Sequence, residues 1–350
     1  MAILLFLPVR RVQHFPSLLA VTLALLGLNA CAQPSQQAAT PGAVASTQTS
    51  SRLPPDALAT PQAGTLAERT ERLKQNVLDH LIFLKGGTFE MGDWGLEVGE
   101  KLPYDMGPDA RPLHKVTLDG FSMMAYKVTY ADFDVFTDRT GEQRINQDPD
   151  WLKDRAPRKP AGVNWHGAKA YCQWLGKLTG QPFDLPTEAQ WEYAARSGGK
   201  RFLFATDNGS IDKGRNYPDS WRMTDDRVPD IGTYPPNPAG VFGLLDYGSR
   251  EWVNDWYDPN YYKVSPENNP KGPEQGSMVM RGDKGAMEKV QRGLLGASPA
   301  FGGYVFSRGS STPKTFQVWL KGKENEPLPG YSSSPEYQFR CAVNAPKPLR

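Results

Sequence analysis

Three cysteines are the side chains of this chain best suited to do chemistry: Cys31, Cys172 and Cys341. A thiolate can attack an electrophile or bind a soft metal ion, whereas two thiols in an oxidising compartment can join as a disulfide. From the residues alone, Cys172 and Cys341 are either a disulfide or a reactive thiol pair. The role of Cys31 depends on the segment that precedes it.

The segment before Cys31 is typical of a secretion signal. Arg10 and Arg11 form a basic start, and Leu18–Leu28 is an apolar run too short to span a bilayer comfortably. The run ends in Leu-Asn-Ala-Cys, which resembles the lipobox of bacterial lipoproteins, so we expect lipid on Cys31. Ala32 favours sorting to the inner leaflet of the outer membrane, facing the periplasm. An ordinary cleaved signal with an incidental cysteine is the alternative.

The composition excludes two broad classes of protein. Mean hydropathy is −0.54 and 39% of residues are hydrophobic, which is too polar for a multispanning membrane protein. The formal charge is only +2 and no basic tract follows the signal, which disfavours binding to nucleic acid. Residues 32–64 contain almost no large apolar side chains and predict a disordered tether. We therefore expect a signal peptide (1–30), a lipidated tether (31–64) and one domain (65–350).

Helix signals are clear in the first half of the domain, and strands are expected elsewhere. The pattern predicts helices that start at Thr65 and Tyr130, a helix over 168–180, and one over 187–196 capped by Thr187 with Gln190. Two short strands are expected around Gly86 and Gly87, and another over 116–121. The 34 glycines and 31 prolines indicate much loop, and after Arg196 we expect short strands only.

A set of sequence motifs, in a fixed order, covers nearly all of the domain. They are GGTFEMGD (86–93), HKVTLDGFSM (114–123), VTYADFDVFTDRTG (128–141), VNWHGAKAYCQWL (163–175), LPTEAQWEYAAR (185–196), YPPNPAGVFGLLD (234–246), REWVNDWYD (250–258), MRGD (280–283) and FRCA (339–342). Their combination resembles the formylglycine-generating enzyme family, also called the sulfatase-modifying factor domain. The resemblance implies a compact α+β fold, related to that of C-type lectins, with little regular secondary structure.

The resemblance also gives the cysteines separate roles. It implies a structural Cys172–Cys341 disulfide, worth about 4–5 kcal/mol on the entropic model. The family enzyme oxidises a substrate cysteine with two thiolates that bind monovalent copper, placed shortly after an RGG-like turn. We match that turn to Arg281-Gly282-Asp283, so Met287 and Arg292 lie near the two places. Neither side chain supplies a thiolate, and no copper is expected.

Calcium and iron are the other metals that the family uses. By resemblance, Asp246 and Glu251 match ligands of a structural calcium site, and Asn216 with Asp225 could form a second. The segment between Asp246 and Glu251 is shorter than in the family, and Lys127 replaces a glutamate. For iron, the histidines of the domain are far apart in sequence, which does not favour a metal triad: His80, His114 and His166.

The lost thiolates favour a non-catalytic binding protein as the leading hypothesis. Family members of this kind include immunity lipoproteins, so we expect a periplasmic lipoprotein that neutralises a phospholipase effector of type VI secretion. The polar insertion 309–337 lies near the lost catalytic segment. Candidate contacts to the protein partner are Met287, Arg292, Arg308 and Trp319.

Two alternatives stay open. The first is an enzyme that works without cysteine, of the siderophore-tailoring type, with acid–base groups among Asp283, Glu288, Arg292 and Arg308. A deep pocket lined by these residues would favour it, and a filled surface would favour binding. The second alternative is an accessory lipoprotein of a secretion system or another assembly.

Overall fold

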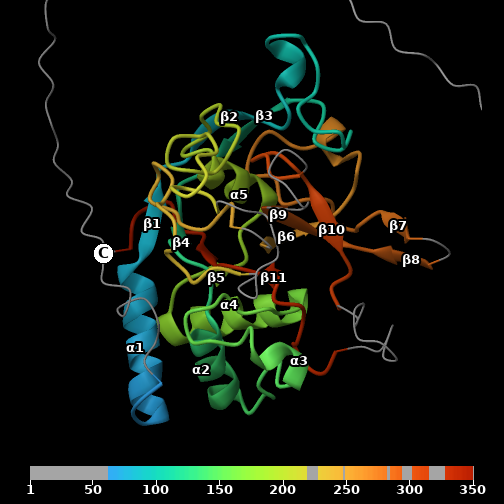
Figure 1. Ribbon diagram of the computed structural model, residues 1–350. Helices are drawn as coiled ribbons and strands as arrows, with labels where there is room; N and C mark the ends of the chain where they lie inside the picture. The colour runs from blue at the N-terminus through green and yellow to red at the C-terminus, as the bar shows by residue number, and fades with distance from the viewer. Residues whose placement is uncertain are drawn as a thin grey trace, which may run out of the picture. The chain divides into compact units, whose positions relative to one another are not determined.

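The computed structural model describes residues 62–218, 228–246, 249–281, 284–293, 302–314 and 328–349. They belong to one compact unit, Arg52–Arg350 (Figure 1). The predicted signal peptide, the lipidation site Cys31 and nearly all of the tether lie outside the described residues, as do Asp225 and Trp319. Within the described ranges, no helix is long and apolar enough to cross a membrane.

The predicted capping boxes are present in the structure. Thr65 caps α1 (Leu66–Asp79) together with Glu68, and Thr187 caps α5 (Glu188–Ala195) together with Gln190. Each threonine accepts from a backbone N–H in the first turn, and the partner side chain accepts in return from the threonine N–H. A further capping box, not predicted from the sequence, starts α2 (Tyr130–Thr140).

The longest helix, α4 (Trp165–Thr179), starts three residues before the predicted position. The Asn164 side chain accepts from the Gly167 N–H and so caps an earlier first turn. Gly180 ends the helix with a left-handed φ of 69°, a conformation that a residue without Cβ adopts easily. The short helix α3 (Pro149–Leu152) and two 3-10 turns (Gly95–Glu97 and Tyr261–Lys263) complete the helical elements among the described residues.

The strands form two four-stranded sheets and two two-stranded ribbons. The first sheet has the order β1 (Leu81–Leu84), β4 (Phe121–Met124), β12 (Ala342–Val343) and β5 (Phe183–Asp184). The second has the order β10 (Gly309–Ser311), β9 (Lys289–Gly293), β6 (Arg250–Trp256) and β11 (Tyr337–Gln338). The ribbons are β2 (Gly87–Met91) with β3 (His114–Leu118), and β7 (Met278–Arg281) with β8 (Lys284–Met287).

Two strand predictions need correction in detail. Strands β1 and β2 flank Gly86 as expected, but they belong to different sheets. The single strand expected over 116–121 is in fact the end of β3 and the start of β4, separated by Asp119 and Gly120. A Cβ on Gly86 would lie 2.4 Å from the Leu118 carbonyl oxygen, so this crossing of chains requires glycine.

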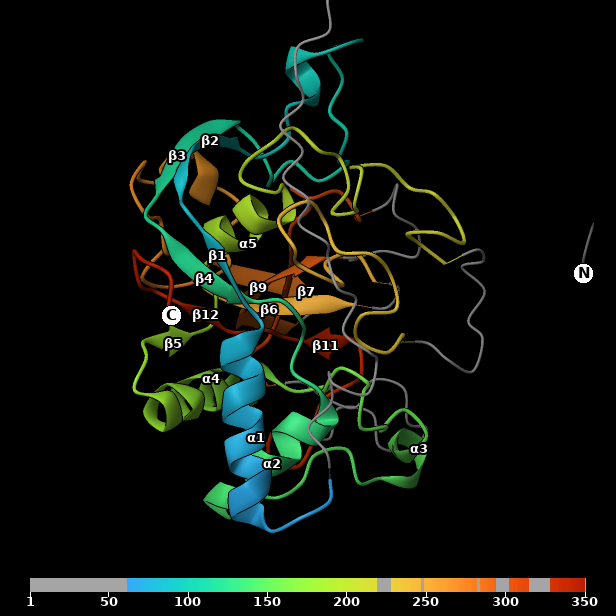
Figure 2. The same cartoon turned by 90° about the vertical axis from the view of Figure 1, so that its left-hand side faces the viewer.

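The second sheet lies between two helices. Both ribbon views show α5 on one side of β6 and β9 and α4 on the other (Figures 1 and 2). Trp191 and Val290 belong to the hydrophobic cluster on the α5 side. Trp252 and Tyr171 belong to the cluster around α4. The α+β fold predicted from the sequence is therefore confirmed, and its central layer is the β6–β9 pair.

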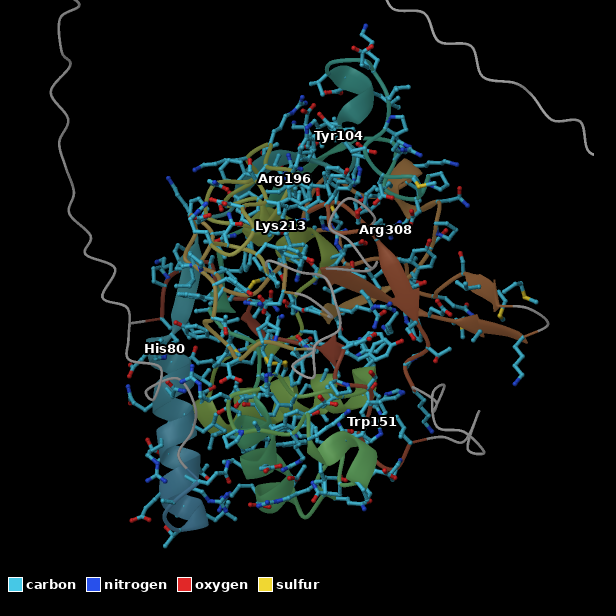
Figure 3. The ribbon with its side chains drawn as sticks, viewed as in Figure 1. His80, Tyr104, Trp151, Arg196, Lys213 and Arg308 are labelled. Carbon is cyan, nitrogen blue, oxygen red and sulfur yellow. A yellow bond between two sulfur atoms is a disulfide. The ribbon has the colours of Figure 1, made fainter. Side chains whose placement is uncertain are left out.

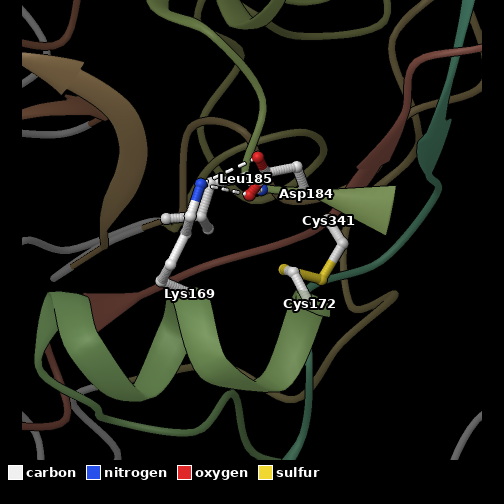
Figure 4. Close-up of a disulfide and its surroundings, with 5 residues drawn as sticks. All are labelled: Lys169, Cys172, Asp184, Leu185 and Cys341. Carbon is white, nitrogen blue, oxygen red and sulfur yellow. Dashed lines mark hydrogen bonds and ion pairs between the residues drawn. A yellow bond between two sulfur atoms is a disulfide. The ribbon is translucent and has the colours of Figure 1, made fainter. Parts of the chain in front are cut away.

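The disulfide implied by the family resemblance is present (Figure 4). Cys172 of α4 and Cys341, directly before β12, are joined with their Cα atoms 5.6 Å apart. Both residues are fully buried. The bond fastens α4 to the first sheet and joins two residues that are 169 positions apart in the sequence.

Candidate functional site

A buried ion-pair cluster joins the central sheet to α5. The guanidinium of Arg292, on β9, lies 2.8 Å from Oε1 of Glu188 and 2.8 Å from Oε2 of Glu192. None of the three side chains is more than 2% exposed. The two glutamates face the same strand because they are one helical turn apart on α5.

Arg308 completes the cluster from the opposite side. Its Nε and Nη2 donate to the two oxygens of Glu188 at 2.7 and 3.0 Å, and its guanidinium lies over the ring of Tyr262. Burial alone would raise the pKa of Glu188, but Arg308 and Arg292 outweigh it and lower the pKa. The carboxylate is therefore ionised and shared between two arginines, an arrangement that holds the cluster together.

Arg196, at the end of α5, is connected to this cluster through Glu192 (Figure 3). Glu188 and Arg196 belong to the same motif, LPTEAQWEYAAR, but they do not pair with each other. The structure instead pairs Arg196 with Glu192 at 3.1 Å, and Glu188 with the arginines of the sheet side. Residues 188 and 196 are two helical turns apart, too far for a direct contact.

A second buried pair lies at the predicted calcium site. The ammonium of Lys127 is 3.0 Å from Oδ2 of Asp246 and 2.6 Å from Oγ of Ser249. Glu251 instead pairs with Arg340, whose Nε and Nη2 donate to its carboxylate at 2.7 and 2.8 Å. Each carboxylate proposed as a calcium ligand therefore already has a cationic partner from the protein.

These residues do not fit a calcium ion. A Lys127 ammonium beside Asp246 would repel a divalent cation, and Glu251 would have to leave Arg340. Asn216, from the second proposed site, is buried in its own loop, where its Oδ1 accepts from the Asp212 N–H. Its predicted companion Asp225 lies outside the described residues. Among the described residues, no group of three or more histidine, cysteine, aspartate or glutamate side chains could hold a metal ion.

The predicted partner contacts differ widely in accessibility. Arg292 and Arg308 are 0% and 8% exposed and are held by glutamates, so their side chains are not available to a partner in this state. Met287 is partly exposed on β8, with its sulfur 3.4 Å from Nε2 of Gln275. Trp319 lies outside the described residues.

The ribbon that carries Met287 has an exposed apolar surface that the sequence reasoning missed. Met278 and Met280 on β7 are each 63% exposed. Figure 1 shows the β7–β8 hairpin extending away from the body of the domain. Methionine side chains adapt their shape to apolar partners, and they are common at protein-binding surfaces. The alternation of methionine with Val279 on a short strand is the sequence signal that could have indicated this surface.

Two buried titratable groups lie on the central strands. Burial, with the charge of Glu188 adding to it, raises the pKa of Asp255 to about 7. Burial lowers the pKa of Lys289 to about 8, and its ammonium lies between the rings of Trp165 and Trp256, 4.1 and 3.8 Å from their centroids. Asp255 accepts from the Glu188 N–H at 2.9 Å and so supports the first turn of α5.

A polar pocket of about 330 Å³ opens beside the start of α5. Its lining comes from segments far apart in the sequence, including the β3–β4 turn, β5, β6 and the residues after β12. Its polar members are Asp119, Asp184, Thr187, Gln190, Asn254, Asn269, Lys271 and Asn344. It is separate from the ion-pair cluster, because neither Arg292 nor Arg308 lines it.

A family model, the Sulfatase-modifying factor enzyme 1-like domain, matches residues 66–345. The chain belongs to this family. Formylglycine-generating enzymes are among its relatives: that of Streptomyces coelicolor is 30% identical over 280 residues, covering 65% of this chain and 85% of its own. That of Mus musculus is 30% identical over 218 residues, covering 47% of this chain and 56% of its own.

The chain is also similar to proteins with other names. The serine/threonine-protein kinase pkn1 of Chlamydia pneumoniae is 30% identical over 237 residues, covering 62% of this chain and 34% of its own. The chain thus spans only about a third to a half of the length of several relatives. The structure of PvdO from Pseudomonas aeruginosa aligns with a TM-score of 0.53 and 24% identity, covering 76% of this chain and 94% of that one. This likeness shows that the two chains share a fold.

Two arginine-glycine pairs lie in different parts of the fold. Arg281, which we matched to the RGG-like turn, ends β7 in the outlying hairpin. Arg292 and Gly293 end β9, which pairs with β6, the strand that carries the REWVNDWYD motif. The sequence contains no cysteine after either pair up to residue 301.

Proposed function

We propose that this chain is a non-catalytic binding protein on the sulfatase-modifying factor scaffold, anchored by lipid on Cys31 at the periplasmic face of the outer membrane. The observation that carries the proposal is the β7–β8 hairpin. It extends from the domain and carries Met278 and Met280 at 63% exposure each. Exposed apolar side chains gathered on one element are typical of protein–protein contact.

The chemistry of the remaining residues supports binding over copper-dependent oxidation. Beyond Cys31 the chain has two cysteines, and both form the disulfide. Copper chemistry of the family type requires two thiolates that can reach the metal. No such pair is left in the domain, whatever the position of the RGG-like turn.

The structure gives little support to the alternative of a cysteine-independent enzyme. Glu288 is 1% exposed and accepts from the Ser310 hydroxyl, and Arg292 and Arg308 are held in the ion-pair cluster, so all three side chains are buried and engaged. Asp283 lies outside the described residues. A deep pocket lined by these groups was the feature expected of an enzyme, and the polar pocket beside α5 is not lined by Glu288, Arg292 or Arg308.

The partner we propose is a secreted toxin, in the sharper version a phospholipase effector of type VI secretion. Export and anchoring would place the domain where such an effector acts. The exposed methionines would cover an apolar surface of the toxin. This sharper version rests on the predicted signal and anchor together with the hairpin.

In-cell photo-crosslinking followed by a protection assay tests the proposal. A photo-reactive residue at Met280 should crosslink one protein, and the same residue at Met106, which is 84% exposed elsewhere, should not. Full-length chain should then protect cells from that protein when it is delivered to the periplasm, and the Met278→Glu/Met280→Glu variant should not. Crosslinks that are equal from both positions would overturn the hairpin as a binding surface. Growth inhibition that is the same with and without the chain would overturn the immunity role.

A further inference from the structure

We infer that the polar pocket beside α5 binds a small zwitterion, an amino acid or a short peptide. The inference is independent of the toxin partner, because no residue of the β7–β8 hairpin lines the pocket. The pocket has a volume of about 330 Å³, within the range of small-ligand sites. Its ligand can be read from the hydrogen-bonding groups that its walls leave unused.

The first unused donor is on Asn254. The ammonium of Lys169 lies 2.8 Å from Oδ1 of Asn254, and an ammonium can only donate. This contact fixes which end of the amide is oxygen. The NH2 group of Asn254 therefore has no hydrogen-bond partner among the described residues.

The second unused donor is on Asn344, and a chain of contacts fixes it. The Thr187 N–H donates to Oε1 of Gln190, so the Gln190 NH2 must be the group that donates to Oδ1 of Asn344 at 2.8 Å. The NH2 group of Asn344 is then left over in the same way. Two primary amides thus offer N–H donors at one pocket.

Lys271 adds a positive charge to these donors. Its side chain is exposed, lines the pocket and makes no hydrogen bond or ion pair within the described ranges. A carboxylate is an acceptor with no donor of its own, and it matches a wall of two amides and an ammonium. One end of the ligand is therefore a carboxylate.

Asp119 supplies a negative charge and a free acceptor to the same pocket. Its Oδ2 accepts from Nδ2 of Asn269, and the Asp119 N–H donates to Oδ1 of Asn269, which holds the carboxylate in place. Its Oδ1 has no partner among the described residues. Asp184, the other acid of the lining, is already paired with Lys169 at 2.6 Å (Figure 4). One free anionic oxygen and one free ammonium in the same pocket match a ligand that carries both charges.

Calorimetric titration of the purified full-length chain in detergent tests the inference. The probes are L-alanyl-L-alanine and L-glutamate, with acetate, methylamine and glucose as ligands that have only some of the required groups. We expect saturable one-site binding of a zwitterion at or below about 1 mM, with acetate and methylamine weaker by at least about tenfold. No saturable binding of either zwitterion up to about 10 mM would overturn the inference, as would glucose binding as tightly as the dipeptide.

Conservative variants assign the contacts. Asn344→Asp keeps the acceptor for Gln190 but replaces the free donor by a negative oxygen, and Lys271→Met removes the positive charge. Each should weaken zwitterion binding by about tenfold or more. Lys263→Met is the matched control, because Lys263 is exposed and its ammonium bonds, among the described residues, to Asn260 alone. Unchanged affinity in both pocket variants would contradict the site, and an equal loss in Lys263→Met would show that the effect is not local.

Discussion

The ammonium of Lys127 lies 3.0 Å from the carboxylate of Asp246, and the two side chains are only 1% and 8% exposed. By resemblance to the family, this lysine replaces a glutamate. The buried site holds an internal cation, which neutralises the negative charge of Asp246. Lys127 therefore disfavours calcium at this site and should also be important for stability.

Removal of Lys127 should destabilise the domain strongly. Lys127→Met leaves Asp246 buried without a cation, which we expect to cost about 3–5 kcal/mol of unfolding free energy. Urea unfolding measures it. The double variant Lys127→Met/Asp246→Leu should recover most of the loss, because it removes both charges. A single variant as stable as the wild type would show that the pair is not buried as described.

Metal removal should leave the stability of the domain unchanged. Lys127 and Arg340 already neutralise Asp246 and Glu251, so EDTA should not lower the thermal midpoint, and millimolar calcium should not raise it. Differential scanning calorimetry with EDTA and then with excess calcium is the measurement. A midpoint that rises by several degrees with calcium, and not with magnesium, would restore the calcium site of the family.

Reduction of the disulfide should lower stability by about 2–5 kcal/mol, since Cys172 and Cys341 close a long loop. Urea unfolding with and without dithiothreitol gives the difference. The Cys172→Ala/Cys341→Ala variant should be as unstable as the reduced chain and should not respond to dithiothreitol. If the wild-type curves coincide in both conditions, the bond does not form in the protein.

Asp255 should make the domain less stable as the pH rises from about 4 to about 7. Its pKa is raised from 3.8 to about 7 in the folded chain, so over this interval the folded state binds more protons than the unfolded state. The loss should reach at most roughly 4 kcal/mol at pH 7. Asp255→Asn imitates the protonated acid, keeps an acceptor for the Glu188 N–H, and should flatten the dependence. An identical pH profile for the two proteins would show that Asp255 titrates normally.

The sequence predicted those features that depend on local patterns. Thr65 and Thr187 cap helices because a threonine and an acceptor three residues later satisfy the first turn without help from the rest of the chain. The disulfide could be inferred only through the family resemblance. The break at Asp119 and Gly120 could not be predicted from local patterns. It arises because β3, before it, and β4, after it, belong to separate sheets.

The partners of the buried charges could not be read from the sequence. Glu188 pairs with Arg292 and Arg308, which are more than a hundred residues away, rather than with a residue of its own motif. MRGD and QRGL each contain an arginine followed by glycine, and the sequence does not tell which arginine is buried. The pairing of β9 with β6 places Arg292, of the second motif, in the core.

The central claim is that the domain acts by binding a protein through the β7–β8 hairpin. The measurement that tests it most directly is the calorimetric affinity of the partner crosslinked at position 280 for three purified full-length chains: wild type, Met278→Glu/Met280→Glu, and the Met106→Glu control. We predict that the hairpin variant binds at least about tenfold more weakly, a loss of about 1.4 kcal/mol, while the control binds like the wild type. Equal affinity in all three chains would contradict the claim.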